Sequence, residues 1–315
     1  MTLQSKPAWA GDDLLSRCVN LLIQTKPLYA LMKQQARQVL IQTAEKNGVP
    51  WRKHYEELEA SGIQQQMAQV TNPTVSYPDY YQVPFHAYEQ GNLCWQAAFE
   101  AESATYAMAL RVWKNEALTW QTAQERLRQS FHDVLAQFIP SPVHNILDIG
   151  CSVGISTLAV HRFYQSRQDI PVHTVGLDLS PYMLTVAQHR DVDHEIAQWI
   201  HANAEATDLP NCSFDLVTLQ FVTHELPGHA TTAIFQEAFR LLRPGGCLAI
   251  VDNNPQSPVI QNLPPVLFTL MKSTEPWSDD YYTFNLEATL QAIGFKQIIT
   301  VPSDPRHRTL VGRKP

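Results

Sequence analysis

The strongest constraint on the fold is a regular alternation, from residue 143 onward, between short β-rich runs and stretches with helical spacing. The β-rich runs are NILDIG, HTVGLDL, a short run near Trp199–His201, FDLVTLQF and CLAIVD. Helical spacing is found at about 155–164, 181–189 and 231–242. Strands that alternate in this way with helices form a parallel sheet covered by helices on both faces. The sequence therefore predicts an α/β fold with a doubly wound sheet.

The end of the chain breaks this alternation. Two further β-rich runs, FKQIITV and RTLVGRK, are separated by only six residues, 302–307. A parallel pair needs a crossover of about a dozen residues or more, so these two runs must pair antiparallel. We therefore expect a seven-stranded sheet that ends in an antiparallel C-terminal hairpin.

The first part of the chain is predicted to be helical. Residues 12–47 carry apolar residues in steps of three and four, which predicts two helices broken at Pro27. Two more helices are predicted at 93–115 and 118–138. The aromatic, proline-punctuated segment 76–95 is expected to be an ordered loop, because disordered linkers contain few aromatic residues.

Two prolines close together mark the boundary between these parts. They lie in the sequence IPSP, residues 139–142, where they stop any helix from continuing. We expect residues 1–139 to form a helical lid region that covers the substrate, and residues 140–315 to form the sheet domain. An insertion at 255–285 is expected to contribute to the substrate pocket of that domain.

Composition narrows the classes of function. The chain of 315 residues has 23 basic and 30 acidic residues, so its net charge of −7 does not support nucleic-acid binding. Five scattered cysteines form no CxxC pair, which argues against disulfides and a zinc site and fits a reducing compartment. His189, His194 and His201 lack carboxylate or cysteine partners at ligand spacing, so no metal site is predicted. No uncharged apolar run is long enough to span a membrane, and we expect a cytoplasmic protein without a transmembrane segment.

A glycine-containing turn, DIGCSVG, follows the first predicted strand. Gly150 and Gly154 let the backbone bend tightly and approach a ligand, and the next helix offers free N–H groups to it. Asp178 ends the second strand, where a carboxylate can accept both hydroxyls of a ribose. The glycine spacing does not match the dinucleotide pattern G-x-G-x-x-G. An ordinary glycine-rich turn is the alternative interpretation.

Five segments in order resemble the successive motifs of class I S-adenosylmethionine-dependent methyltransferases: DIGCSVG, GLDLS, NAEATDLP, FDLVTLQFVTHELP and LLRPGGCLAIVD. The terminal hairpin is similar to the reversed seventh strand of that family, and the resemblance covers residues 143–315. Within the class, the chain most resembles the ubiquinone/menaquinone-biosynthesis type of small-molecule methyltransferase. Three further segments resemble uncharacterised relatives from cyanobacteria and plant plastids: HAYEQGNLCW, MKSTEPWSDDYY and DPRHRTLVGRKP.

The resemblance implies a Rossmann-like fold that binds S-adenosylmethionine and releases S-adenosylhomocysteine. It implies that Asp148 and Gly150 face the methionine part of the cofactor, that Asp178 binds the ribose and that Leu179 packs on the adenine. Ser152 departs from the pattern, because many members have a second glycine there. The other implied cofactor contacts are Cys151, Ser152, Gly154, Asn203, Ala204, Glu205, Gln220 and Phe221.

Methyl transfer needs in-line geometry, and a base only if the acceptor must lose a proton. His224 and Glu225 follow the fourth strand and so lie at the carboxyl edge of the sheet, where ligands bind. His224 is a candidate base, with a structural or capping histidine as the alternative. Glu225 could orient His224 or be a solvated loop acid. His86 and Tyr88, in the aromatic segment, could reach over the site as a lid.

Acceptor contacts are expected from three places. Asn253 and Asn254 follow the fifth strand, where they could bind substrate or form an Asx turn. The aromatic residues of the insertion could line a pocket or belong to the core. The predicted acceptor contacts are Tyr88, Trp95, Asn253, Asn254, Tyr281 and Tyr282.

The preferred hypothesis is methyl transfer to oxygen or carbon of a small, hydrophobic or aromatic acceptor. A methyltransferase acting on protein or nucleic acid is an alternative, although FVTHELP lacks the Asn/Asp-Pro-Pro-Tyr pattern of amino-group methylation and no Pro-Cys dipeptide is present. The other alternative is a non-catalytic protein that binds the cofactor. The sequence does not address the oligomeric state.

Overall fold

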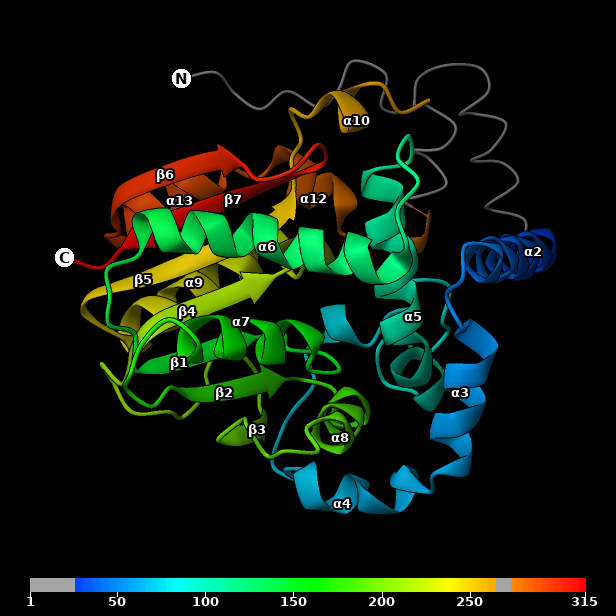
Figure 1. Ribbon diagram of the computed structural model, residues 1–315, viewed down its shortest axis with the longest axis horizontal. Coiled ribbons are helices and arrows are strands. Elements are labelled where there is room, and N and C mark those ends of the chain that lie inside the picture. Colours follow the sequence, from blue (N-terminus) through cyan, green and yellow to red (C-terminus); the bar gives the residue numbers. More distant parts are fainter. Residues whose placement is uncertain (1–25, 265–272) are drawn as a thin grey trace.

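The computed structural model describes residues 26–264 and 273–315 (Figure 1). Its strands are β1 (Asn145–Ile149), β2 (His173–Asp178), β3 (Gln198–His201), β4 (Phe214–Gln220), β5 (Leu242–Asn253), β6 (Lys296–Pro302) and β7 (His307–Arg313). They form one seven-stranded sheet in the order β3-β2-β1-β4-β5-β7-β6. The first five strands pair parallel, and β7 pairs antiparallel with both β5 and β6. The predicted doubly wound sheet with an antiparallel C-terminal hairpin is therefore confirmed.

Helices cover both faces of this sheet. α6 (Trp120–Phe138) and α7 (Ile155–Gln165) lie on one face, and α9 (Gly228–Leu241) and α13 (Leu286–Ile293) lie on the other (Figure 1). Each pair of helices packs its apolar side into a separate core cluster with the strands. Parallel strands buried on both faces need apolar residues at successive positions, which explains runs such as NILDI and CLAIV.

The position of α6 changes the expected domain boundary. Phe131, Val134 and Leu135 of this helix are buried in the same cluster as Ile146 of β1 and Val251 of β5. A boundary at 139/140 would separate α6 from the sheet that it covers. The two prolines therefore lie in a turn between a helix and a strand of one packed unit, and we propose a boundary before α6 instead.

The remaining N-terminal elements lie at the end of the sheet toward which the arrows of β2 and β4 point (Figure 1). Two hydrogen bonds fix this arrangement. Asn72 N–H donates to Nδ1 of His201 at the end of β3, and Ser180 Oγ, after β2, donates to the carbonyl of Asn92. The N-terminal block therefore covers the carboxyl edge of the sheet. Its main helices are α2 (Lys26–Lys46), α3 (Trp51–Ala60), α4 (Met67–Val70) and α5 (Trp95–Val112).

Most predicted elements of this block are present. The helices expected at 93–115 and 118–138 are α5 and α6, and residues 76–94 are an ordered loop with a bridge between Phe85 and Tyr88. The helix break expected at Pro27 is only partly testable, because residues before 26 lie outside the described residues. α3 and α4 were not predicted. Among the described residues, no helix combines the length and apolar character needed to cross a bilayer.

The insertion after β5 is described in part. It contains α10 (Pro258–Gln261) and α12 (Ser278–Thr283), and residues 265–272 between them lie outside the described residues. α12 returns to the carboxyl edge, where Tyr281 donates a hydrogen bond to the carbonyl of Asn253. The insertion therefore meets the end of β5 at the same edge as the N-terminal block.

Candidate active site

The turn after β1 has the backbone that its glycines predict. Gly150 and Gly154 have φ angles of +70° and +80°, in the left-handed region. The N–H groups of Gly150 and Cys151 donate to the carbonyl of Leu177 at 2.8 and 3.0 Å, which ties the turn to β2. A Cβ added at Gly150 would lie 2.5 Å from Cγ2 of Val222. Glycine is therefore required here by both conformation and space.

Asp178 lies beside this turn at the end of β2. Its Oδ2 accepts from the N–H of Ser152 and its Oδ1 from the N–H of Ser180, both at 2.8 Å. Burial raises the pKa of Asp178 to about 6, although the backbone hydrogen bonds lower it. Each oxygen retains capacity to accept a further hydrogen bond. Ser152 has a φ of +49°, in the left-handed region that glycine adopts without strain.

Asp148, in β1, is bound by its neighbours. Its carboxylate accepts from the hydroxyls of Thr157 and Thr218, both at 2.6 Å, and from Nε2 of Gln220 at 3.3 Å. Burial raises its pKa, although the three hydrogen bonds oppose that change. We conclude that Asp148 orients Gln220 and fixes β1 against β4.

Two buried polar groups next to Asp148 are unsatisfied among the described residues. They are Oε1 of Gln220, and Nε and Nη1 of Arg128, whose guanidinium carbon lies 5.7 Å from the ring centre of Phe221. Burial lowers the pKa of Arg128 to about 10, so it stays cationic at neutral pH. Sequence reasoning missed Arg128. An arginine next to Leu127 on the apolar side of a helix was the available signal.

His224 is held by a buried aspartate. Nδ1 of His224 lies 2.8 Å from Oδ1 of Asp252, and its backbone N–H donates to Oδ2 at 3.0 Å. The Thr223 hydroxyl donates to the same Oδ2 at 2.6 Å. Burial lowers the pKa of His224, but Asp252, Glu275 and Glu225 together raise it to about 10. Sequence reasoning missed Asp252, although it ends the run CLAIVD.

Three further groups surround His224. One side-chain ligand atom each of His86, His224 and Glu225 lies within 4.8 Å of the others, and Nε2 of His86 lies 3.9 Å from Oε1 of Glu275. Burial raises the pKa of Glu225 to about 7 and also raises that of Glu275. The predicted grouping of His86 with His224 and Glu225 is thus present. Asn92, which donates to Oε2 of Glu225 at 3.2 Å, was not predicted.

The aromatic loop covers the other side of the edge. Tyr80 donates to Oε1 of Glu205 at 2.6 Å, and Nδ1 of His201 accepts from the backbone of Asn72. Nε2 of His201 is therefore the protonated nitrogen, and it donates to the carbonyl of Leu179 at 3.1 Å. The loop is thereby fixed next to the residues expected at the adenine, Leu179 and the run Asn203, Ala204 and Glu205.

Three predicted residues have packing roles. Tyr88 donates to Glu100 at 2.7 Å, and the Trp95 ring packs between Phe99 and Tyr182, with centres 5.4 and 5.0 Å apart. These contacts direct Tyr88 and Trp95 into the N-terminal core, and they do not bring either residue to the acceptor side. The Cys151 thiol is buried, and burial raises its pKa, so it fills the turn as a small residue.

The residues expected after β5 and in the insertion are also engaged. Oδ1 of Asn254 accepts from the N–H of Gln256, which is the Asx turn considered as the alternative. Oδ1 of Asn253 accepts from Nε of Arg306 at 2.9 Å. Tyr281 is 2% exposed, and its ring meets that of His224 edge-on, with centres 6.3 Å apart. Tyr282 is buried and packs edge-on against Tyr281, so it fixes the ring that His224 contacts.

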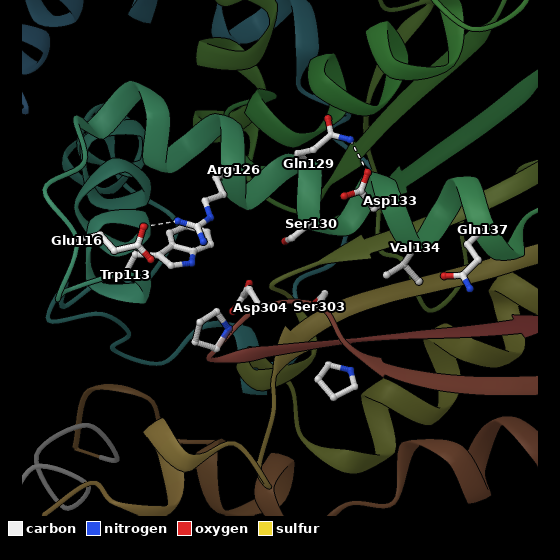
Figure 2. Close-up of a pocket in the computed structure, with 12 residues that line it drawn as sticks. Trp113, Glu116, Arg126, Gln129, Ser130, Asp133, Val134, Gln137, Ser303 and Asp304 are labelled. Carbon is white, nitrogen blue, oxygen red and sulfur yellow. Dashed lines mark hydrogen bonds and ion pairs between the residues drawn. The ribbon is translucent and has the colours of Figure 1, made fainter.

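A pocket of about 420 Å³ lies outside this set of residues (Figure 2). It lies between the outer side of α6 and the turn after β6, and no predicted site residue lines it. Its polar groups pair with one another, Arg126 with Glu116 and Gln129 with Asp133. These charged and amide groups of the pocket are therefore paired, whereas Oγ of Ser303 has no partner among the described residues.

Comparison with known proteins relates a segment of this chain to a known family. Residues 147–250 match a family model described as a methyltransferase domain. This segment is similar to methyltransferase domains. It contains Asp148, the glycine turn, Asp178, Gln220 and His224. The matched segment does not include four other residues of the site, which are His86, Arg128, Asp252 and Glu275.

Relatives and a solved structure extend this result. Over 165 residues, 50% of this chain, the sequence is 28% identical to a demethylmenaquinone methyltransferase of Lactiplantibacillus plantarum and covers 67% of it. Over 129 residues, 41% of this chain, it is 37% identical to a trans-aconitate 2-methyltransferase of Azoarcus and covers 46% of it. The chain thus spans about half to two thirds of these curated relatives. A candidate O-methyltransferase structure from Nostoc punctiforme has a TM-score of 0.52 and 19% identity, covering 82% of this chain and 69% of that one. The fold of the methyltransferase domain is that of class I S-adenosylmethionine-dependent enzymes.

Proposed function

We propose that this chain transfers a methyl group from S-adenosylmethionine, by in-line displacement, to oxygen or carbon of a small, hydrophobic or aromatic acceptor. The observation that carries the proposal is the pair of unsatisfied buried groups beside Asp148, Gln220 and Arg128. Leaving a buried hydrogen-bonding group unpaired costs about 1–3 kcal/mol, so a ligand that pairs it binds with that much advantage.

The two groups fit the amino-acid part of S-adenosylmethionine. Its ammonium needs an acceptor, which Oε1 of Gln220 supplies, and its carboxylate needs donors, which Nε and Nη1 of Arg128 supply. Asp178, at the next strand end, has the remaining acceptor capacity for the ribose hydroxyls. Leu179 and the segment 203–205, covered by Tyr80, would then meet the adenine.

The other side of the edge is proposed to hold the acceptor. When bound, S-adenosylmethionine supplies a methyl group on a positively charged sulfur, and positioning provides most of the acceleration. Because Nδ1 of His224 is bonded to Asp252, only Nε2 can meet the acceptor. We propose that this nitrogen takes a proton from the acceptor when neutral and holds its oxygen when protonated. The N-terminal block excludes water from the carboxyl edge during transfer.

Two observations support a small acceptor. The N-terminal block and the insertion cover the carboxyl edge of the sheet, which leaves little access for a folded protein or a duplex. The ring of Tyr281 meets that of His224 edge-on, which places an aromatic group next to the acceptor side. The relatives' names include a quinone-type acceptor and a small carboxylic acid, and the aromatic surroundings favour the first.

Calorimetric titration with S-adenosylmethionine and S-adenosylhomocysteine tests the proposal. Arg128→Met should weaken the binding of both by at least about tenfold, because a charge-assisted contact to the carboxylate is lost. Arg126→Met is the matched control, since Arg126 lies two positions away in the same helix and pairs with exposed Glu116. No binding to the wild-type chain, or equal binding by Arg128→Met, would overturn the cofactor assignment. A labelled methyl donor then screens quinols, phenols and fatty acids as acceptors.

A further inference from the structure

We propose that His86, His224, Glu225 and Glu275 bind a divalent metal ion at the acceptor side of the site. The inference rests on the proposed function and changes one part of it: with the ion bound, Nε2 of His224 would be a metal ligand, and the ion would hold the acceptor oxygen in place of that nitrogen. The four residues come from three separate parts of the chain: the aromatic loop, the turn after β4 and the segment before α12. Nothing in the spacing of the sequence groups them.

The side chains converge as metal ligands do. One ligand atom each of His86, His224 and Glu225 lies within 4.8 Å of the other two. Oε1 of Glu275 lies 3.9 Å from Nε2 of His86, which adds a second carboxylate on that side. Two imidazoles with one or two carboxylates suit first-row divalent ions such as zinc and manganese.

His224 is oriented in the way that metal-binding histidines are. Its Nδ1 is bonded to the fully buried Asp252, which leaves Nε2 as the nitrogen available to a metal ion. A metal-binding histidine almost always donates its other nitrogen to a carboxylate or carbonyl, which fixes the tautomer and the ring. Asp252 is itself held by the N–H of Asn253 at 2.7 Å and by the hydroxyl of Thr223. The support for His224 is therefore rigid.

The two glutamates are oriented in a similar way. Oε2 of Glu225 accepts from Asn92, and Oε2 of Glu275 accepts from the Ser278 hydroxyl, both at 3.2 Å. Across residues 26–264 and 273–315, the other oxygen of each carboxylate accepts no hydrogen bond. Each glutamate thus has one oxygen fixed by the protein, and the other oxygen of Glu275, Oε1, is the one that lies near His86.

His86 is held in a strained backbone conformation. Its φ is +48°, and Ala87 follows with +69°, so two successive residues with a Cβ occupy the left-handed region. Such strain persists only where the surroundings impose it, and it gathers at functional sites. Here the N–H of His86 donates to the carbonyl of Thr274 at 2.9 Å, and Phe85 pairs with Tyr88. This turn brings His86 next to Glu275.

Charge favours a cation at this position. Three carboxylates lie around this position: those of Glu225 and Glu275 in the cluster, and that of Asp252, which is bonded to His224. A divalent ion compensates this charge and keeps coordination positions for the acceptor. The acceptor class that fits is a small molecule with adjacent oxygens, such as an aromatic diol or a hydroxy acid.

Metal binding to the full chain tests the inference directly. The chain is treated with a chelator and titrated with zinc chloride by calorimetry, and separately with manganese chloride followed by electron paramagnetic resonance. We expect one ion per chain. His224→Gln and Glu225→Gln should each weaken the affinity by at least about tenfold, and Asp252→Asn, which only orients His224, by about 10–100-fold. His189→Gln, an exposed histidine of α8 (Pro181–Arg190), is the matched control and should bind as the wild type does.

Titration of the same variants with S-adenosylmethionine shows whether they are folded and separates the two proposals. Loss of metal binding with unchanged S-adenosylmethionine binding supports the metal site. Wild-type chain that binds neither ion, or variants that bind the ion as the wild type does, overturn the metal site. If S-adenosylmethionine binds in that case, the proposed function stands. Metal binding without any S-adenosylmethionine binding overturns the proposed function instead.

Discussion

Three polar residues of the site are more than nine-tenths buried and keep hydrogen-bonding capacity that the described residues do not use. They are Asp178, Gln220 and Arg128. Burial acts on them in opposite directions: it raises the pKa of Asp178 to about 6 and lowers that of Arg128 to about 10. Both groups nevertheless remain charged at neutral pH. Individual residues of this site are therefore poised to bind a ligand with both charges and hydroxyls.

The pKa of Asp178 predicts how S-adenosylmethionine affinity depends on pH. The ionised carboxylate is the better acceptor for ribose hydroxyls, so affinity should fall as the pH decreases through about 6. Titration calorimetry from about pH 5 to about pH 8 measures this fall. Asp178→Asn should bind at least about tenfold more weakly at pH 8 and should lose the dependence near pH 6. A fall that persists in Asp178→Asn would assign it to another group.

His224 belongs to the transfer step and not to cofactor binding. His224→Ala should decrease turnover by about 10²–10⁴-fold, because a positioned proton-transfer group contributes that much. The affinity for S-adenosylmethionine should stay near the wild-type value, since the groups proposed to bind it lie around Asp148 and Asp178. Single-turnover assays with a labelled methyl donor measure the first quantity and calorimetry the second. Full activity in the variant would remove His224 from the reaction.

At the scale of elements, the site is built where strands end. β1, β2, β4 and β5 all finish at one edge. Asp178 and Asn253 are the last residues of β2 and β5, and the glycine turn and His224 follow β1 and β4. Two elements from elsewhere close this edge, the loop 76–94 and α12. Their contacts are hydrogen bonds to strand ends, so the edge is shaped by loops held on a rigid sheet.

The glycine turn gives a stability prediction at this scale. A Cβ at Gly154 would lie 2.7 Å from Cη2 of Trp199 and 3.2 Å from Cβ of Ala187. Gly154→Ala should decrease the free energy of unfolding by about 1–2 kcal/mol from the left-handed backbone, with a further loss from crowding.

Gly245→Ala separates these two effects. Gly245 has a similar φ of +84°, but a Cβ there would meet only the end of the Arg313 side chain, at 3.5 Å. In Gly245→Ala, the free energy of unfolding should therefore decrease only by the contribution of the left-handed backbone. Urea denaturation of both variants measures the difference, and equal destabilisation would show that Trp199 moves aside at no cost.

At the scale of the whole molecule, α6 joins the two parts of the chain. Its buried Leu127, Phe131, Val134 and Leu135 contribute roughly 6–12 kcal/mol, at about 1.5–3 kcal/mol for each apolar side chain. That is comparable with the net stability of a whole domain. The same helix carries Arg128 to the carboxyl edge, so packing and cofactor binding depend on one element.

Two truncated chains test this role of α6. Residues 140–315 should fail to fold, because the sheet face under α6 would be exposed to water. Residues 116–315 keep α6 and should fold, with a cooperative thermal transition, while losing His86 and the rest of the block over the carboxyl edge. Near-ultraviolet circular dichroism and thermal melts compare the two. A cooperative transition of residues 140–315 alone would restore the boundary at 139/140.

Local patterns were enough to predict the backbone of this protein. Alternation of β-rich and helical runs, the short link before the last strand and the glycines of the turn each depend on residues near one another in the chain, so they can be read without tertiary contacts. Asp178 was found for the same reason, since it is placed by its position at a strand end. The N-terminal helices were predicted by periodicity, except α3 and α4, which are short.

The chemistry of the edge was decided by packing. Arg128 comes from a helix before the matched domain, Asp252 and Glu275 follow later in the chain, and His86 precedes them all. Whether such groups meet depends on which helix covers which face and where each loop crosses the edge. Side chains distant in sequence leave no periodic signal of their contact, so only the tertiary structure could show that Arg128 is buried beside Asp148, or that His86 faces His224.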